Sequence, residues 1–117
     1  MPAINPKVIA DLRALQAGGS PGFLVELIDI FLKEADGHLV KLRESYAAQD
    51  ARAFERSAHT LKGSSGNLGA QAMSRICADL QTAGHAADWT RAAAALLGLE
   101  TEYRSVKVEL EVERSRP

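Results

Sequence analysis

The chain has 117 residues and a formal net charge of -1, because 14 lysines and arginines nearly balance 15 aspartates and glutamates. That balance gives no electrostatic case for nucleic-acid binding, since proteins that bind nucleic acid usually carry a strongly basic face. The length corresponds to one domain that is large enough to bury a core. Hydrophobic residues make up 46% of the chain and aromatic residues only 5%, and an apolar fraction built mainly from Ala and Leu favours helices over a sheet.

The first two predicted helices begin at clear start signals. Asn5–Pro6 supplies a capping side chain and a residue suited to the first helical turn, and this short helix ends before Gly18. Ser20–Pro21 repeats the same signal, and apolar residues at helical spacing then continue to about Gln49. A helix of that length in a small domain is typical of a bundle.

The third and fourth predicted helices are shorter. Asp50 is a suitable cap for the third helix, which extends to about Asn67. The fourth helix is predicted from Ala70 to Thr82, and Gly84 is expected to stop it.

A last helix completes an all-α architecture. Asp88 is its predicted cap, and the alternating segment 111–117 is expected to fray as a tail or linker. The short connections favour antiparallel neighbours. We therefore predict a single domain over 1–117 that forms an up-down-up-down four-helix bundle with a short extra helix at the N-terminus.

The third helix presents a histidine in unusual surroundings. Its apolar stripe is predicted to consist of Phe54, Ala58, Leu61, Ser65 and Leu68. His59 lies off that stripe, on the side of Gly63, Gly66, Arg52 and Arg56. Glycine inside a helix costs about 1 kcal/mol relative to alanine, so two glycines beside an exposed imidazole indicate that another macromolecule approaches the ring. The alternative is that the glycines only weaken the helix end and that His59 is an ordinary surface residue.

Other candidate sites have weaker support. His38, expected on the exposed face of the long helix, and His85, expected in a loop, have no spacing that would make a metal-ligand pair with His59. Ser64 and Ser65 lack the GxSxG elbow of a hydrolase. The GSSGNLG segment lacks the lysine and the preceding strand of a phosphate-binding loop.

The cysteine content and the hydropathy pattern exclude further classes. Cys77 is the only cysteine, so no intrachain disulfide can form, and it is predicted to pack in the core. We find no run of about eighteen apolar residues and no signal-peptide pattern. We therefore expect a cytoplasmic protein that does not insert into a membrane.

The segment AHTLKGSSGNLGA resembles the histidine-containing phosphotransfer (HPt) family of two-component phosphorelays. The matching positions are His59, Lys62, Gly63, Ser64, Ser65 and Gly66. The segments INPKVIADLRAL, SPGFLVELIDIFLKEA and RICADLQ also resemble the helices that precede and follow the motif in that family. The resemblance extends to about Tyr103.

The resemblance implies a role for each motif residue. His59 would accept and donate the phosphoryl group, Lys62 would neutralise phosphoryl charge, and Gln81 on the next helix would hydrogen-bond near the imidazole. The residues implied at the partner-docking surface are Gly63, Gly66, Arg52 and Arg56, together with apolar residues at the edge from the long second helix.

The resemblance also implies the partners. The phosphoryl group would come from the aspartyl phosphate of one receiver domain and pass to the aspartate of another, with Mg²⁺ held by the receiver and no cofactor or metal site on this chain. Such a module is a phosphocarrier, not an enzyme with its own ATP-binding domain, and we expect a monomer. Two alternatives stay open: an adaptor bundle that docks receivers without phosphorylation, and the phosphoryl-accepting domain of a chemotaxis-type kinase. The histidine argues against the first and the length of the chain against the second.

Overall fold

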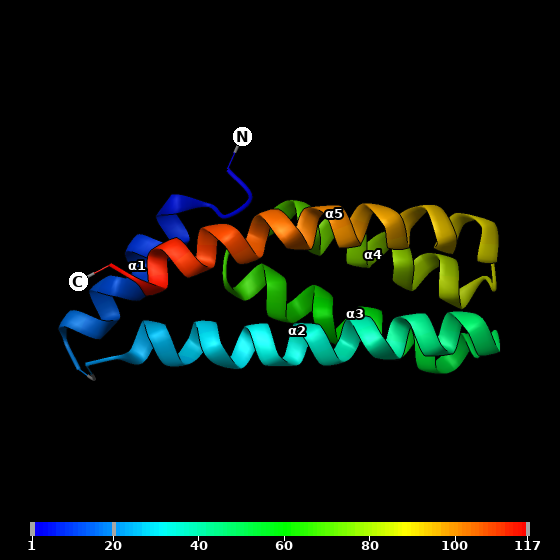
Figure 1. Cartoon of the computed structure of the whole chain (residues 1–117), viewed down its shortest axis with the longest axis horizontal. Coiled ribbons are helices and arrows are strands. Elements are labelled where there is room, and N and C mark those ends of the chain that lie inside the picture. Colours follow the sequence, from blue (N-terminus) through cyan, green and yellow to red (C-terminus); the bar gives the residue numbers. More distant parts are fainter. Residues whose placement is uncertain (1, 20, 117) are drawn as a thin grey trace.

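A computed structural model describes residues 2–19 and 21–116, which form five helices and, within those ranges, no strand. The helices are α1 (Pro6–Ala17), α2 (Phe23–Ala48), α3 (Ala51–Asn67), α4 (Gln71–His85) and α5 (Trp89–Arg114). The last four form the bundle, and α3 and α5 each pack mainly against α2 and α4 (Figure 1). α3 and α5 therefore occupy opposite corners. The predicted all-α bundle with a short N-terminal helix is confirmed.

The helices of the bundle differ in length, and α1 compensates for the difference. α2 and α5 each have 26 residues, whereas α3 has 17 and α4 has 15. At about 1.5 Å per residue the long helices extend roughly 15 Å beyond the short ones. α1 lies at that end, where α2 begins and α5 ends (Figure 1).

Polar contacts hold α1 and the segment before it in place. The Asn5 amide donates to the Gly69 carbonyl at 2.9 Å, and the Leu24 amide donates to Gln16 Oε1 at 2.9 Å. The Arg13 guanidinium donates to the Glu113 carboxylate at 2.9 Å. The N-terminal region is thus tied to the α3–α4 turn and to both long helices.

The predicted aspartate and asparagine caps are confirmed. The side chains of Asn5, Asp50 and Asp88 each accept a hydrogen bond from a backbone amide in the first turn of α1, α3 and α5. The start of α2 differs from the prediction. Pro21 lies before the helix, the cap is Gly22 with a φ of 80°, and Ser20 falls outside the described residues.

Gly84 does not stop α4, which continues to His85. A Cβ at Gly84 would lie 2.8 Å from Cδ1 of Phe54 and 3.3 Å from the backbone nitrogen of Glu55. This glycine is therefore buried inside the helix, at a point where α4 approaches α3 too closely for any side chain. The sequence prediction mistook a packing glycine for a stop signal.

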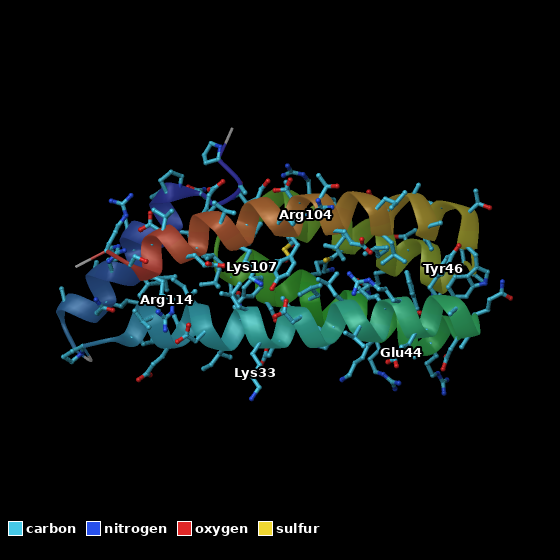
Figure 2. The ribbon with its side chains drawn as sticks, viewed as in Figure 1. Lys33, Glu44, Tyr46, Arg104, Lys107 and Arg114 are labelled. Atoms are coloured by element: carbon cyan, nitrogen blue, oxygen red, sulfur yellow. The ribbon has the colours of Figure 1, made fainter. Side chains whose placement is uncertain are left out.

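The expectation that the chain frays after residue 110 is wrong as far as Arg114, the last residue of α5. Leu110 is fully buried. Nε and Nη2 of Arg114 donate to the two carboxylate oxygens of Asp29 at 2.6 and 3.0 Å, and Figure 2 shows Arg114 directed toward α2. These contacts explain why the alternating sequence stays helical. Pro117 lies outside the described residues.

The core runs along the whole bundle. Phe54 and Tyr46 both pack edge-on against Trp89, with ring centroids 5.6 and 5.9 Å apart. Cys77 is fully buried, as predicted, and burial raises the pKa of its thiol to about 12. Among the described residues, no helix has the length and apolar character needed to cross a membrane.

Candidate functional site

α3 places its apolar stripe in the core and His59 in solvent. The five residues predicted for the stripe are all buried: Phe54, Ala58, Leu61, Ser65 and Leu68. The hydroxyl of the buried Ser65 donates to the Leu61 carbonyl at 2.7 Å, so no polar group of the stripe is left unpaired. The opposite face carries His59, which is exposed together with Arg52 and Arg56. The predicted orientation of this helix is confirmed.

The space beside His59 is open on the next turn of the helix. Gly63 follows His59 by four residues, a spacing at which side chains on a helix are neighbours. A Cβ at Gly63 would have no atom of a neighbouring element within 4 Å. Nothing inside the molecule requires a glycine here, and the missing side chain leaves the backbone beside His59 open to solvent.

Gly66 differs from Gly63 although both are exposed. A Cβ at Gly66 would lie 3.4 Å from Oγ of Ser74 on α4. Gly66 therefore lies at the boundary between the open face and the α3–α4 contact, and it allows the two helices to approach each other.

The backbone of the motif is fixed to α4 at Lys62. The Ser74 hydroxyl donates to the Lys62 carbonyl at 2.9 Å, and Oγ of Ser65 lies 3.1 Å from the same carbonyl oxygen. Lys62 is half-buried and follows His59 by three residues, so its ammonium group can reach the space next to the imidazole. Ser74 carries no sequence signal that would have marked it as a support of this site.

Gln81 lies on the face of α4 that borders α3. Ser74 contacts α3 near one end of that face, and His85 contacts it at the other, with its Nδ1 3.4 Å from the Glu55 carboxylate. Gln81 stands one turn before His85, which places it at about the level of His59. Gln81 is half-buried, and no hydrogen bond joins its side chain to that of His59.

The two other histidines lie elsewhere than expected. His85 is the last residue of α4 and is exposed. His38 is half-buried and faces the groove between α2 and α3, which Arg56, Ser57 and Thr60 also line. Its Nδ1 is buried and has no hydrogen-bond partner in the part of the chain that the structure describes. Burial, assisted by Lys41 and opposed by Glu34, lowers the pKa of His38.

Glu55 was not identified from the sequence as a neighbour of His59. It lies one turn before His59 and is half-buried beside His85. The spacing of four residues from His59 could have indicated it, because such residues are neighbours on a helix.

One exposed apolar side chain of α2, that of Ile30, lies close to α3. Ile30 is 55% exposed and lines a shallow apolar pocket with Leu12 and Leu27. Ser64 and Asn67 of α3 form the far wall of this pocket. An apolar edge therefore borders the C-terminal half of α3.

Hydrolase chemistry has no support in the geometry. The Ser64 hydroxyl donates to the Thr60 carbonyl at 3.1 Å, and the Ser65 hydroxyl is bonded inside the core. Neither hydroxyl contacts His59. Within residues 2–19 and 21–116, no group of three or more His, Cys, Asp and Glu side chains could hold a metal ion.

Comparison with known sequences gives a consistent result. The model of the Hpt domain family matches residues 26–114. Histidine-containing phosphotransfer protein 2 of Arabidopsis thaliana is 25% identical over 104 residues, which cover 86% of this chain and 67% of that protein. Histidine-containing phosphotransfer protein 5 of the same plant is 25% identical over 105 residues, with coverages of 87% and 67%.

The fold is also similar to solved structures. The crystal structure of histidine-containing phosphotransfer protein B (HptB) from Pseudomonas aeruginosa PAO1 superposes with a TM-score of 0.88 at 29% identity, covering 99% of this chain and 97% of that one. The structure of ZmHP2 from maize gives a TM-score of 0.79 at 24% identity, with coverages of 95% and 86%. At that identity the maize structure supports the fold alone.

Proposed function

The chain belongs to the Hpt domain family, a family of histidine phosphotransfer intermediates in two-component signalling, and from this premise we propose that His59 carries the phosphoryl group. It accepts the group from the aspartyl phosphate of one receiver domain and passes it to the aspartate of another. The observation that carries the proposal is the exposed imidazole on a helix whose opposite face is fully buried, with open backbone at Gly63 on the next turn.

The chemistry needs a nucleophile and little else from this chain. A neutral imidazole has one nitrogen with a free lone pair and is a competent nucleophile near pH 7. When that nitrogen attacks phosphorus, an N–P bond forms and the P–O bond to the receiver aspartate breaks, so the aspartate leaves as a carboxylate. The second transfer is the reverse of the first on another receiver.

Positioning and charge neutralisation account for most of the catalysis in phosphoryl transfer. The buried stripe of α3 and the Ser74–Lys62 hydrogen bond hold this helix in place, so the backbone that carries His59 has a fixed position. Lys62 supplies a positive charge close to the incoming phosphoryl oxygens. The Mg²⁺ ion belongs in this proposal to the receiver's own carboxylates, because the groups that flank His59 here are largely cationic.

The receiver docks over the exposed face of α3. Gly63 and Gly66 let the receiver backbone approach the imidazole, and Arg52 and Arg56 face the acidic rim of the receiver pocket. The apolar edge around Ile30 adds an apolar contact with the receiver. Such a surface suits a short-lived complex, which a carrier with two partners requires.

The decisive experiment is phosphoryl transfer from a phosphorylated receiver domain. The wild-type chain should become labelled with a phosphate that is labile in acid and stable in base, and His59→Gln should abolish the label. His85→Gln is the matched control, since it removes an exposed histidine from the neighbouring helix. Label that persists in His59→Gln would contradict the assignment. Absence of label from the wild type and from both variants would favour a bundle that only docks receivers.

The role of Lys62 has its own test. Lys62→Gln should slow transfer by about tenfold, because one charge that stabilises the transferring group is lost in a partly solvated site. Lys107→Gln is the control, since Lys107 is also half-buried but lies on α5 (Figure 2). Equal rates for the two variants would remove Lys62 from the mechanism.

A further inference from the structure

α5 carries a second uncharged stripe on the side opposite its core residues. The buried stripe consists of Ala92, Leu96, Leu99, Tyr103, Val106 and Leu110. The outer stripe follows successive turns of the helix and is exposed throughout: Thr90, Ala94, Leu97, Gly98, Thr101, Ser105, Val108 and Val112. Its large members are well exposed, Leu97 at 70%, Val108 at 64% and Val112 at 52%. A solvent-facing helix surface normally carries charged residues.

We propose that this outer face of α5 pairs with the same face of a second copy of the chain, with the two helices antiparallel. When Thr101 lies at the two-fold axis, the pattern becomes self-complementary. Leu97 of each copy then faces the small Ser105 of the other. By the same register Val108 faces Ala94, so each large side chain meets a small one.

The opposite orientation fits less well. In a parallel pair, each residue of the stripe faces its own counterpart, so Leu97 meets Leu97 and Val108 meets Val108. The small residues then also face each other and leave gaps, which forfeit packing contacts. The arrangement of sizes along the stripe therefore favours the antiparallel pair.

Charge supports the same register. Arg104 flanks the stripe next to the axis, on the same side as Glu100. In the antiparallel pair Arg104 of each copy faces Glu100 of the other, which gives two symmetric ion pairs. Within one copy the Arg104 Nε donates only to the backbone carbonyl of Glu100, at 3.4 Å, and the structure pairs the guanidinium with no carboxylate of the described residues. The Glu100 carboxylate accepts a bond from Arg43 at 3.2 Å.

The interface is expected to be modest. From Thr90 to Val112 the stripe is about 33 Å long, and one pair of helices of that length gives an interface at the lower end of the range for specific complexes, on the order of 1,000 Å². Glu102 of each copy also approaches its counterpart on the other flank, which opposes pairing. We therefore expect a reversible dimer in the micromolar range.

The pairing leaves His59 accessible in both copies, because α3 and α5 occupy opposite corners of the bundle (Figure 1). A dimer would present two phosphotransfer faces that point away from each other. The inference does not depend on the proposed function, since it concerns α5 alone. It departs from the monomer expected from the sequence.

The oligomeric state of the full chain tests the proposal. Sedimentation equilibrium should show a mass that rises from monomer to dimer with concentration across the micromolar and submillimolar range. Val108→Glu should weaken the dimer by about tenfold or more, with an unchanged circular dichroism spectrum because Val108 is exposed. A monomer mass at all concentrations, or a dimer that Val108→Glu leaves intact, would overturn the proposal.

Two further variants test the register. Thr101→Cys should form a disulfide-linked dimer under mild oxidation, because Thr101 lies at the axis, whereas Ala94→Cys should not. The native Cys77 is buried and does not interfere. Linking of both variants would indicate a parallel pair and would overturn the antiparallel arrangement. Arg104→Glu and Glu100→Arg should each weaken the dimer, and the double variant should restore it.

Discussion

α3 and α5 lie at opposite corners of the bundle and face the same two neighbours, yet their outer surfaces have different chemistry. α3 has a buried stripe and an outer face of polar residues, with Gly63 beside an exposed histidine. α5 has a buried stripe and an outer face with exposed aliphatic residues. The inner stripes build the same bundle, so the difference between these helices lies in the chemistry of their solvent-facing surfaces.

The largest expected effect is the difference in the free energy of unfolding between alanine substitutions in the inner stripe of α3 and in the outer stripe of α5. Leu61→Ala should lower the free energy of unfolding by about 2 to 5 kcal/mol, because the side chain is fully buried and its removal leaves a cavity. Leu97→Ala should change it by less than about 0.5 kcal/mol, because Leu97 is exposed in a single copy. Urea denaturation at low protein concentration measures both, and similar losses would show that Leu97 is buried.

Two glycines should respond to the same substitution with opposite signs. Gly84→Ala should destabilise the fold by about 1 to 3 kcal/mol, because the new methyl group would meet Phe54 at 2.8 Å. Gly98→Ala on α5 should stabilise it by about 0.5 to 1 kcal/mol, because the added Cβ meets no neighbouring element within 4 Å and alanine favours the helix. Thermal denaturation compares them, and a stabilising Gly84→Ala would mean that α3 and α4 can separate without cost.

A third comparison concerns access to the outer faces. Gly63→Glu should preserve the fold and slow phosphoryl transfer by about tenfold or more, because it places a bulky anion beside His59 where an anionic group must enter. Gly98→Glu adds the same side chain to α5 and should leave the transfer rate unchanged. Rates that stay equal for both variants would show that the open backbone at Gly63 is irrelevant to transfer.

The smallest expected effect is a pH dependence that arises at His38. Burial lowers the pKa of this histidine in the folded chain, whereas the unfolded chain binds the proton at an ordinary pKa of about 6.5. As the pH falls through that value the unfolded state gains protons first, so the folded state loses stability on the acid side and is unaffected above it. His38→Gln should lose less stability on acidification than the wild type in urea titrations. Parallel losses in both proteins would contradict this.

Much of the fold followed from the sequence because its signals are local. Three caps, formed by Asn5, Asp50 and Asp88, could be predicted from the short-range geometry of helix starts. The buried stripe of α3 followed from helical periodicity, and with it the exposed position of His59.

Several of the errors share a physical origin, since they depend on contacts between distant segments. Gly84 is inside α4 because Phe54 and Glu55 press against it, and α5 continues to Arg114 because Asp29 binds its end. His38 faces a groove that forms only when α2 and α3 pack. The hydrogen bond from Ser74 to Lys62 is of the same kind. Periodicity along one helix does not contain such information.

The buried thiol of Cys77 offers a way to follow the motions of this bundle. Because it is the only cysteine in the chain and its pKa is raised to about 12, it reacts with a thiol reagent only when the helices around it separate. The labelling rate of the unmodified protein therefore reports how often the core opens to solvent. A receiver domain or a second copy that slows this labelling would reveal, without any introduced probe, that docking on the outside of the bundle restrains opening of its interior.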